Sequence, residues 1–162
     1  MPLHLLDKET WDKTLAVNLT GYFLFSKYCI SQMLKQAGNS AIINISSVQG
    51  LASERGVSAY AASKGAINSL TRQMALEYAP KIRVNSICPG TIATPLVVKN
   101  YKEFNVDLKD IERKYPMNRL GKGEEVAKLV KFLATDEDSG FMTGQQFVID
   151  GGIMARGGWA AL

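Results

Sequence analysis

The sequence has few cysteines, no long apolar run and no block of like charge. Its 162 residues contain two cysteines, Cys29 and Cys88, and each lies in an apolar stretch. We therefore expect both to be reduced packing residues in a cytoplasmic protein, not a disulfide pair. No segment approaches the roughly 18 apolar residues that a membrane span requires, and the N-terminus has no apolar segment beside a basic flank. Export and membrane insertion are disfavoured.

Internal repeats, low-complexity segments and basic patches are also absent. The 19 lysines and arginines are scattered among 15 acidic residues, so the net charge of +4 does not indicate nucleic-acid binding. With 46% hydrophobic and 21% charged residues, the composition is typical of a globular domain. The glycines are spread over turn-like sites and form no linker. We expect a single domain over residues 1–162.

Helix and strand patterns alternate along the chain. They predict helices over residues 8–36, 58–78 and 124–135, with Asp7 capping the first, and strands over 41–46, 82–88 and 146–149. The apolar, β-branched run at 41–46 is typical of a strand buried on both faces of a sheet. Residues 95–118 are polar and irregular, with a short helix predicted over 108–114, and we expect them to form a lid.

The order of these elements predicts an α/β fold. Strands that alternate with helices are typical of an open parallel sheet, with right-handed crossovers and helices on both faces. Three strands leave a sheet edge unpaired and an apolar face thinly covered. We therefore expect that further strands precede Met1.

Tyr60 and Lys64 form a candidate proton-transfer pair. They are one turn apart on the predicted helix 58–78, so both side chains lie on one face. A free tyrosine has a pKa of about 10, and a nearby ammonium favours the ionised phenol that acid–base catalysis near neutrality requires. The spacing alone is weak, because it arises by chance in roughly a quarter of chains of this length. The alternative is a solvated surface pair.

Two further polar residues are candidates because of their position. Ser47 directly follows a predicted strand, where the crevice of an open α/β sheet binds ligands; the alternative is a turn-forming serine, and Ser46 competes for the same role. Asn18 lies in the apolar stripe of the first helix between Leu15 and Tyr22, where a buried amide needs a partner. A helix kink is the alternative explanation for Asn18.

The segment Cys88–Thr94 follows the next predicted strand. Pro89 and Gly90 end the strand, and glycine permits close approach of a backbone to a ligand. Exposed backbone amides there can bind a carboxamide. The alternative is an ordinary strand-to-loop turn.

Four motifs in order resemble those of the short-chain dehydrogenase/reductase family. They are Asn18–Gly21, Asn44–Gly50, Tyr60–Lys64 and Pro89–Thr94, and the ending Thr143–Gly152 is similar to the last strand and turn of that family. The resemblance runs from about residue 2 to residue 152. It implies a partial Rossmann-like, doubly wound sheet that forms the C-terminal two-thirds of an NAD(P)-binding domain.

The resemblance also implies an activity and a set of catalytic residues. Members of the family interconvert an alcohol and a carbonyl by hydride transfer to or from NAD or NADP. Tyr60 would be the acid/base, Lys64 would lower its pKa, and Ser47 would hold the substrate oxygen. Asn18 would anchor a water that links Lys64 to solvent.

Further implications concern the cofactor and the partners. The cofactor would contact Tyr60, Lys64, Pro89, Gly90, Ile92 and Thr94, with the Ile92 backbone at the nicotinamide carboxamide and Lys64 at the nicotinamide ribose. The substrate would be a small molecule, and no metal ion, nucleic acid or membrane is expected. Dimers or tetramers of one chain are common in the family.

The sequence departs from the family at two places. It lacks the strand and Gly-rich turn whose helix N-terminus receives the cofactor pyrophosphate, and the residue that selects NAD or NADP. Gly123 stands where relatives usually have proline. The chain is therefore interpreted as an N-terminally truncated oxidoreductase, with a short non-catalytic protein that acts as an interaction or regulatory partner as the alternative. A third interpretation keeps the fold and changes the chemistry to dehydration or epimerisation.

Overall fold

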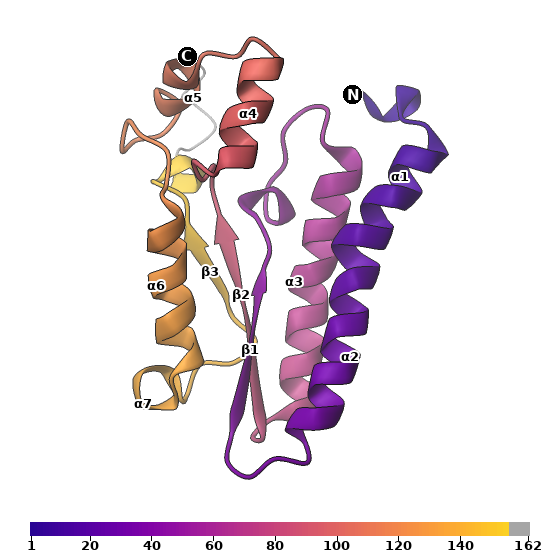
Figure 1. Cartoon of the computed structure of the whole chain (residues 1–162), viewed down its shortest axis with the longest axis vertical. Helices are drawn as coiled ribbons and strands as arrows, with labels where there is room; N and C mark the ends of the chain where they lie inside the picture. Colours follow the sequence, from indigo (N-terminus) through magenta and orange to yellow (C-terminus); the bar gives the residue numbers. More distant parts are fainter. Residues whose placement is uncertain (156–162) are drawn as a thin grey trace.

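The computed structural model describes residues 1–155 and contains a three-stranded parallel sheet. The strands are β1 (Ser40–Ile45), β2 (Ile82–Pro89) and β3 (Gln146–Ile149), in the spatial order β1-β2-β3. The predicted α/β fold with a parallel sheet is confirmed (Figure 1). The bounds of β3 match the prediction, whereas β1 is shifted by one residue and β2 is longer by one residue.

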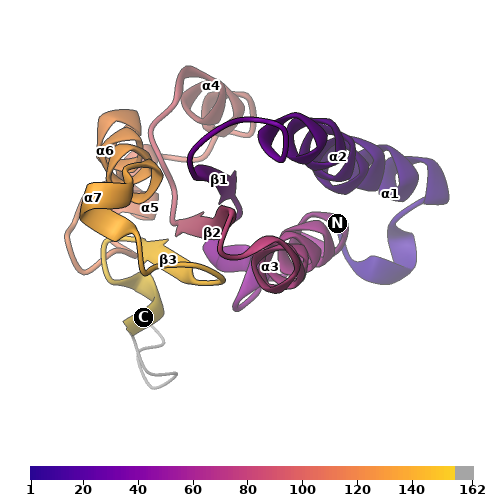
Figure 2. The same ribbon diagram turned by 90° about the horizontal axis from the view of Figure 1, so that it is seen from below.

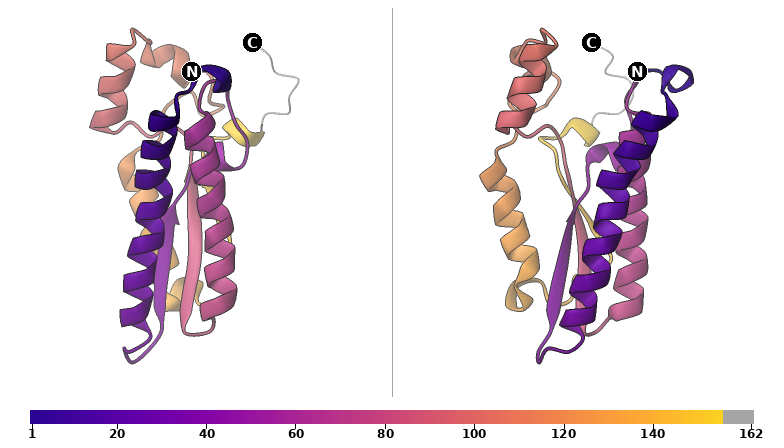
Figure 3. Two further views of the ribbon diagram at one scale, coloured as in Figure 1. Left: turned by 90° about the vertical axis from the view of Figure 1, so that its right-hand side faces the viewer. Right: turned by 45° about the vertical axis from the view of Figure 1, so that its right-hand side comes forward.

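The N-terminal helix predicted over residues 8–36 contains a π-helical turn. Its parts, which follow one another without a break, are α1 (Lys8–Leu15), the π-helical segment Ala16–Thr20 and α2 (Gly21–Met33). Asp7 caps α1 as predicted, because its carboxylate accepts a hydrogen bond of 2.7 Å from Thr10 N. Figure 3 shows this long helix lying along α3 (Ser58–Tyr78), which has the bounds predicted for it.

Helices cover both faces of the sheet, but the two crossovers differ in hand. α3 connects β1 to β2, and α6 (Gly123–Ala134) lies between β2 and β3 in the chain. α2 and α3 lie on one face of the sheet and α6 lies on the opposite face (Figure 1 and Figure 2). Because the strand order advances in one direction, crossovers on opposite faces have opposite hands. The prediction that both are right-handed is therefore wrong for one of them.

A group of buried apolar side chains joins the sheet to α2 and α3. It consists of Ile30, Met74, Ala75, Ile82 and Val84. Every residue of β2 is buried, whereas in β1 only Asn44 is buried. The prediction that strand 41–46 is buried on both faces is therefore wrong, because β1 is an edge strand of the described sheet.

The segment between β2 and α6 is more regular than the sequence indicates. It contains α4 (Pro95–Glu103), which was not predicted, and α5 (Leu108–Glu112), which matches the predicted short helix. Thr94 caps α4 by accepting a hydrogen bond of 3.3 Å from Val97 N, and Pro95 occupies the first helical position. These two residues are a helix-start signal that the polar composition of the segment obscures.

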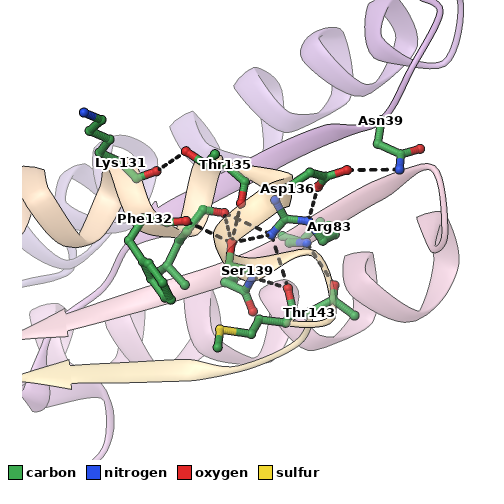
Figure 4. Close-up of polar contacts among 12 residues, drawn as sticks. Asn39, Arg83, Lys131, Phe132, Thr135, Asp136, Ser139 and Thr143 are labelled. Carbon is green, nitrogen blue, oxygen red and sulfur yellow. Dashed lines mark hydrogen bonds and ion pairs between the residues drawn. The ribbon is translucent and has the colours of Figure 1, made fainter.

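A buried arginine fixes the end of α6 against β2. Arg83 Nε is 2.7 Å from Asp136 Oδ1, and Arg83 Nη1 donates to Leu133 O at 2.9 Å and to Ser139 Oγ at 3.2 Å (Figure 4). Asp136 and Ser139 belong to the short helix α7 (Asp136–Ser139), which the sequence did not predict. Hydrogen bonds from Arg83 and Asn39 hold the pKa of Asp136 below its usual value.

The two cysteines differ in their surroundings. Both are free, which agrees with the expectation that they form no disulfide; Cys88 is buried in β2, whereas Cys29 is exposed on α2. The predicted packing role is therefore confirmed for Cys88 and wrong for Cys29, because the face of α2 that carries Cys29 is uncovered. No helix within residues 1–155 has the length and apolarity needed to cross a membrane.

An ion pair before α6 makes the stability of the protein depend on pH. Arg119 Nη1 and Nη2 donate to the two carboxylate oxygens of Glu125 at 2.9 Å and 2.7 Å, and Lys122 N donates to Glu125 at 2.8 Å. These bonds, led by those from Arg119, lower the pKa of Glu125 to about 2. A lowered carboxyl pKa stabilises the fold above the pKa of the unfolded chain, about 4.3, and this contribution is lost as the pH falls to the folded value.

We therefore expect Glu125→Gln to lower Tm at pH 7. The difference from the unaltered protein should shrink between pH 4.5 and pH 2, because protonation of Glu125 removes the same interaction. Thermal unfolding followed by circular dichroism over this pH range measures the difference. Glu124→Gln, at the exposed neighbouring position, is the matched control and should show a smaller change. A Tm difference that does not depend on pH would contradict the assignment.

Candidate active site

Tyr60 and Lys64 lie in the first turns of α3, beside the carboxyl end of β1. Lys64 Nζ donates to Ile45 O at 2.9 Å and lies 5.6 Å from the centroid of the Tyr60 ring. Lys64 is 9% exposed, whereas Tyr60 is 38% exposed. The structure thus places a buried lysine beside an accessible phenol, and it does not show the solvated surface pair that was the alternative interpretation.

Burial is the main influence on the Lys64 ammonium. Desolvation lowers the pKa of Lys64 from its usual value, and attraction to Cys88 in its thiolate form is a smaller, opposing influence. The same burial raises the pKa of Cys88, so the thiol form is favoured. The Ile45 carbonyl is the hydrogen-bond acceptor that compensates the ammonium. The Lys64 side-chain nitrogen is thereby held close to the Tyr60 ring.

The two serines after β1 have different partners. Ser46 is buried, and its hydroxyl donates to Lys64 O at 2.9 Å, which ties the strand end to α3. Ser47 is also buried, and its Oγ accepts a hydrogen bond of 3.1 Å from Gln49 N at the start of a 3-10 turn. Ser46 is therefore engaged in holding α3, whereas within residues 1–155 the Ser47 hydroxyl makes only a local turn contact.

Asn18 lies within the π-helical turn and contacts α3. Its Nδ2 donates to Ser63 Oγ at 3.3 Å, and the Ser63 hydroxyl donates to Tyr60 O at 2.7 Å. The π-helical turn is a local distortion of the helix, which agrees with the structural interpretation of Asn18; such turns are also frequent at functional sites. The residue lies at a distortion of the helix, and it is linked to the turn that carries Tyr60.

The segment after β2 passes close to the C-terminal strand. A Cβ atom at Gly90 would lie 3.1 Å from Asp150 Cα and 3.0 Å from Tyr115 Cε1, so only glycine fits there without a shift. Ile92 forms a parallel bridge with Gly121, and within residues 1–155 no backbone carbonyl accepts a hydrogen bond from Ile92 N. Pro89 is the last residue of β2, and Thr94 caps α4.

A cleft of about 180 Å³ lies next to the Ser47 loop. It is lined by Val48, Gln49, Ala52, Ser53, Glu54, Thr91, Tyr101, Ile111, Lys114, Tyr115, Ile153 and Met154. Tyr101 belongs to α4, and Ile111 to α5, so the segment expected to form a lid contributes one wall. The lining combines apolar side chains with a few polar groups, as is typical of small-molecule sites.

Sequence reasoning missed several residues that shape the site. Tyr115 is buried; it accepts a hydrogen bond of 2.8 Å from Thr91 N and donates one of 2.7 Å to Thr91 Oγ1. Asn68 is buried between the loop and β2, where it bonds Gly50 O at 3.4 Å and Ser86 Oγ at 3.1 Å. For Asn68 the sequence did offer a signal, because it is a polar residue at a position on the inner face of α3. Tyr115 carries no local signal, because its partner is distant in sequence.

Comparison with known proteins identifies relatives along nearly the whole chain. The family profile described as enoyl-(acyl carrier protein) reductase matches residues 1–154. The chain is 42% identical over 157 residues to the inactive 2-(S)-hydroxypropyl-CoM dehydrogenase 2 of Xanthobacter autotrophicus, covering 94% of this chain and 67% of that protein. It is 40% identical over 152 residues to the cyclohexanol dehydrogenase of an Acinetobacter species, covering 93% of this chain and 57% of that protein.

Solved structures give the same relationship. The ligand-free aldohexose dehydrogenase of Thermoplasma acidophilum has a TM-score of 0.91 and 38% identity, covering 99% of this chain and 65% of that one. ElxO with NADP bound has a TM-score of 0.88 and 33% identity, and the match covers 96% of this chain and 62% of that one. A 4-hydroxyisoleucine dehydrogenase complexed with NADH has a TM-score of 0.87 and 34% identity, and the match covers 97% of this chain and 64% of that one. The chain spans about three-fifths of the length of these relatives.

The close approach of Gly50 to α3 leads to a prediction about stability. A Cβ atom at Gly50 would lie 2.7 Å from the Lys64 carbonyl carbon, whereas one at Gly65 would lie 3.7 Å from Gly50 O. We expect Gly50→Ala to destabilise the protein by about 1–3 kcal/mol, because the loop must move away from α3. Gly65→Ala should not destabilise it, since alanine favours the helix by about 1 kcal/mol. Urea unfolding of both variants measures this, and equal effects would contradict the packing argument.

Proposed function

Because the chain belongs to the short-chain dehydrogenase/reductase family, we propose that it carries the catalytic residues of an NAD(P)-dependent oxidoreductase that interconverts an alcohol and a carbonyl. The observation that supports this most is the buried Lys64 ammonium beside the accessible Tyr60 phenol. This arrangement supports the proposal, because an ammonium close to a phenol can stabilise the negative charge that is left when the phenol gives up its proton. Solved relatives of this fold have dehydrogenase names.

In the proposed reaction Tyr60 moves the proton. During reduction its hydroxyl protonates the substrate oxygen, and during oxidation the phenolate takes the proton from the substrate hydroxyl. Ser47, at the end of β1, holds the same oxygen by a hydrogen bond, and Lys64 stabilises the phenolate form of Tyr60. Asn18 binds the water through which the Lys64 ammonium is linked to solvent. A bound nicotinamide supplies or accepts the hydride.

The residues after β2 fit the nicotinamide end of the cofactor. Ile92 N is free of a backbone acceptor within the described residues, so it can donate to a carboxamide oxygen. Gly90 leaves no side chain between the β2 end and the neighbouring segments. Pro89 shapes the strand end, Thr94 would contact the amide or phosphates of a bound cofactor, and Tyr60 and Lys64 would bind its ribose. Relatives with NADP and with NADH make either cofactor compatible with this family.

The remaining elements of the proposal concern substrate, assembly and domain. The substrate is a small molecule that carries an alcohol or a carbonyl and occupies the cleft beside Ser47. Residues 1–162 belong to one Rossmann-type domain, which assembles as a homodimer or homotetramer. The family profile and the parallel sheet support the domain assignment.

A second candidate function is that of a non-catalytic interaction partner. The observation in its favour is the set of large exposed side chains on α2, which includes Phe23 (50% exposed), Phe25 (77%) and Tyr28 (67%). Uncovered apolar side chains grouped on one helix are typical of interaction surfaces. A relative with 42% identity is also named inactive. Measured turnover distinguishes the two candidates.

In a longer protein that contains this chain and turns over substrate, we expect Tyr60→Phe to lower kcat by about 10²–10⁴-fold, because the variant cannot transfer the proton. Cofactor affinity, measured by nicotinamide fluorescence, should stay nearly unchanged, since only the hydroxyl is removed. Turnover is followed by NAD(P)H absorbance with a panel of ketones and alcohols. Tyr28→Phe, at an exposed tyrosine on α2, is the control and should keep full activity. Equal loss of turnover and of cofactor binding would refute the assigned role.

For residues 1–162 alone, we expect no NAD(P)H consumption with any carbonyl and no nicotinamide fluorescence change with NADH or NADPH. The reason is that the sequence contains no Gly-rich turn at a helix N-terminus to bind the pyrophosphate. Fluorescence titration of the purified chain with both cofactors is the measurement. Saturable binding at micromolar cofactor would show that this chain recruits the nucleotide by other residues.

A further inference from the structure

A second tyrosine, Tyr22, contacts the same groups as the proposed catalytic pair. It lies one helical turn beyond Asn18, at the start of α2. The Tyr22 hydroxyl donates to Ile45 O at 2.8 Å, and Lys64 Nζ donates to the same oxygen at 2.9 Å. A carbonyl oxygen has two lone pairs, so these two donors use its full capacity. The strength with which Ile45 binds the ammonium therefore depends on Tyr22.

The Tyr22 ring also lies against the ammonium. Lys64 Nζ is 5.6 Å from the centroid of the Tyr22 ring and 5.6 Å from that of the Tyr60 ring. Both distances are within the range of about 6 Å over which an aromatic face attracts a cation. The ammonium thus lies within reach of two rings from different helices.

The hydrogen bond from Tyr22 to Ile45 is not forced by burial. Tyr22 is half-buried and lines a mostly apolar cavity of about 450 Å³ between α2 and β1, together with residues such as Phe25 and Met33. Because the residue is only half-buried, its hydroxyl is not compelled by burial alone to bond a protein carbonyl instead of water. Its direction toward Ile45 therefore reflects a specific contact with the group that holds Lys64.

We propose that Tyr22 is a positioning residue that holds the Lys64 ammonium beside Tyr60 and moderates its hydrogen bond to the Ile45 carbonyl. The consequence for the reaction rests on the proposed function of Lys64. The titratable groups that face the ammonium are Tyr22 from α2, Tyr60 from α3 and Cys88 from β2. Burial raises the pKa of Tyr22, so its hydroxyl stays protonated and remains a donor near neutral pH.

The test is the titration of Lys64 in the 162-residue chain labelled with ¹³Cε-lysine, followed by NMR. We expect Tyr22→Phe to raise the pKa of Lys64 by about half a unit, because the Ile45 carbonyl then accepts from the ammonium alone and the charged form is favoured. Lys64→Arg assigns the resonance. Tyr28→Phe on the same helix is the matched control and should leave the Lys64 pKa unchanged, since Tyr28 is 67% exposed.

A second measurement needs no variant. In the unaltered chain the Ile45 ¹³C′ resonance should titrate with the Lys64 pKa, because deprotonation weakens the bond to that carbonyl. An Ile45 resonance that does not follow Lys64, or a Lys64 pKa that is unchanged or lower in Tyr22→Phe, overturns the proposal. A lower Tm with an unchanged Lys64 pKa likewise assigns Tyr22 to fold stability alone. Neither measurement depends on turnover. The test of Tyr22 therefore remains valid if the chain is inactive or if the Tyr60→Phe result contradicts the proposed function.

Discussion

The Lys64 ammonium lies in a buried position, and much of the local structure is arranged around that charge. An ammonium removed from water costs several kcal/mol unless polar groups compensate it. Here the carbonyl of Ile45 accepts its hydrogen bond, and two tyrosine rings flank it. The end of β1 and the start of α3 must therefore come together at the Lys64 ammonium. The accessible phenol of Tyr60 lies at the same point because it shares a helix face with Lys64.

The loop after β1 is fixed to α3 by contacts that require small or polar residues. Ser46 donates to the Lys64 carbonyl, Asn68 donates to the Gly50 carbonyl, and Gly50 approaches the α3 backbone too closely for a Cβ atom. Ser47 lies between these anchored positions, and its orientation follows from them. The absence of a side chain at Gly50 thus allows the loop to approach the α3 backbone, and that approach places the serine next to the cleft.

The sequence predicted most elements whose pattern is local, and it failed where a local signal was weak or where partners are distant. The bounds of α3 and β3 follow from periodicity and turn residues, and both are confirmed. α4 was missed because polar composition outweighed the Thr94–Pro95 start signal. The role of Tyr22 was hidden, since helical spacing assigns it to an apolar stripe and its partner Ile45 is on another element. The hand of the crossovers depends on how the long segment before α6 crosses the sheet, which no local pattern encodes.

The unpaired edge of β1 links the candidate active site to any strand that pairs with that edge. The N–H groups of Ser40 and Ser46 bond carbonyls on the β2 side, so, with the alternation of a strand, the Ile45 carbonyl faces the other side. Tyr22 and Lys64 occupy both lone pairs of that carbonyl. A strand that paired with this edge would donate to the same oxygen and must displace one of them. Displacing the half-buried neutral hydroxyl costs less than uncovering a buried ammonium, so Tyr22 would move first. Edge pairing and the environment of Lys64 are therefore coupled through a single oxygen atom.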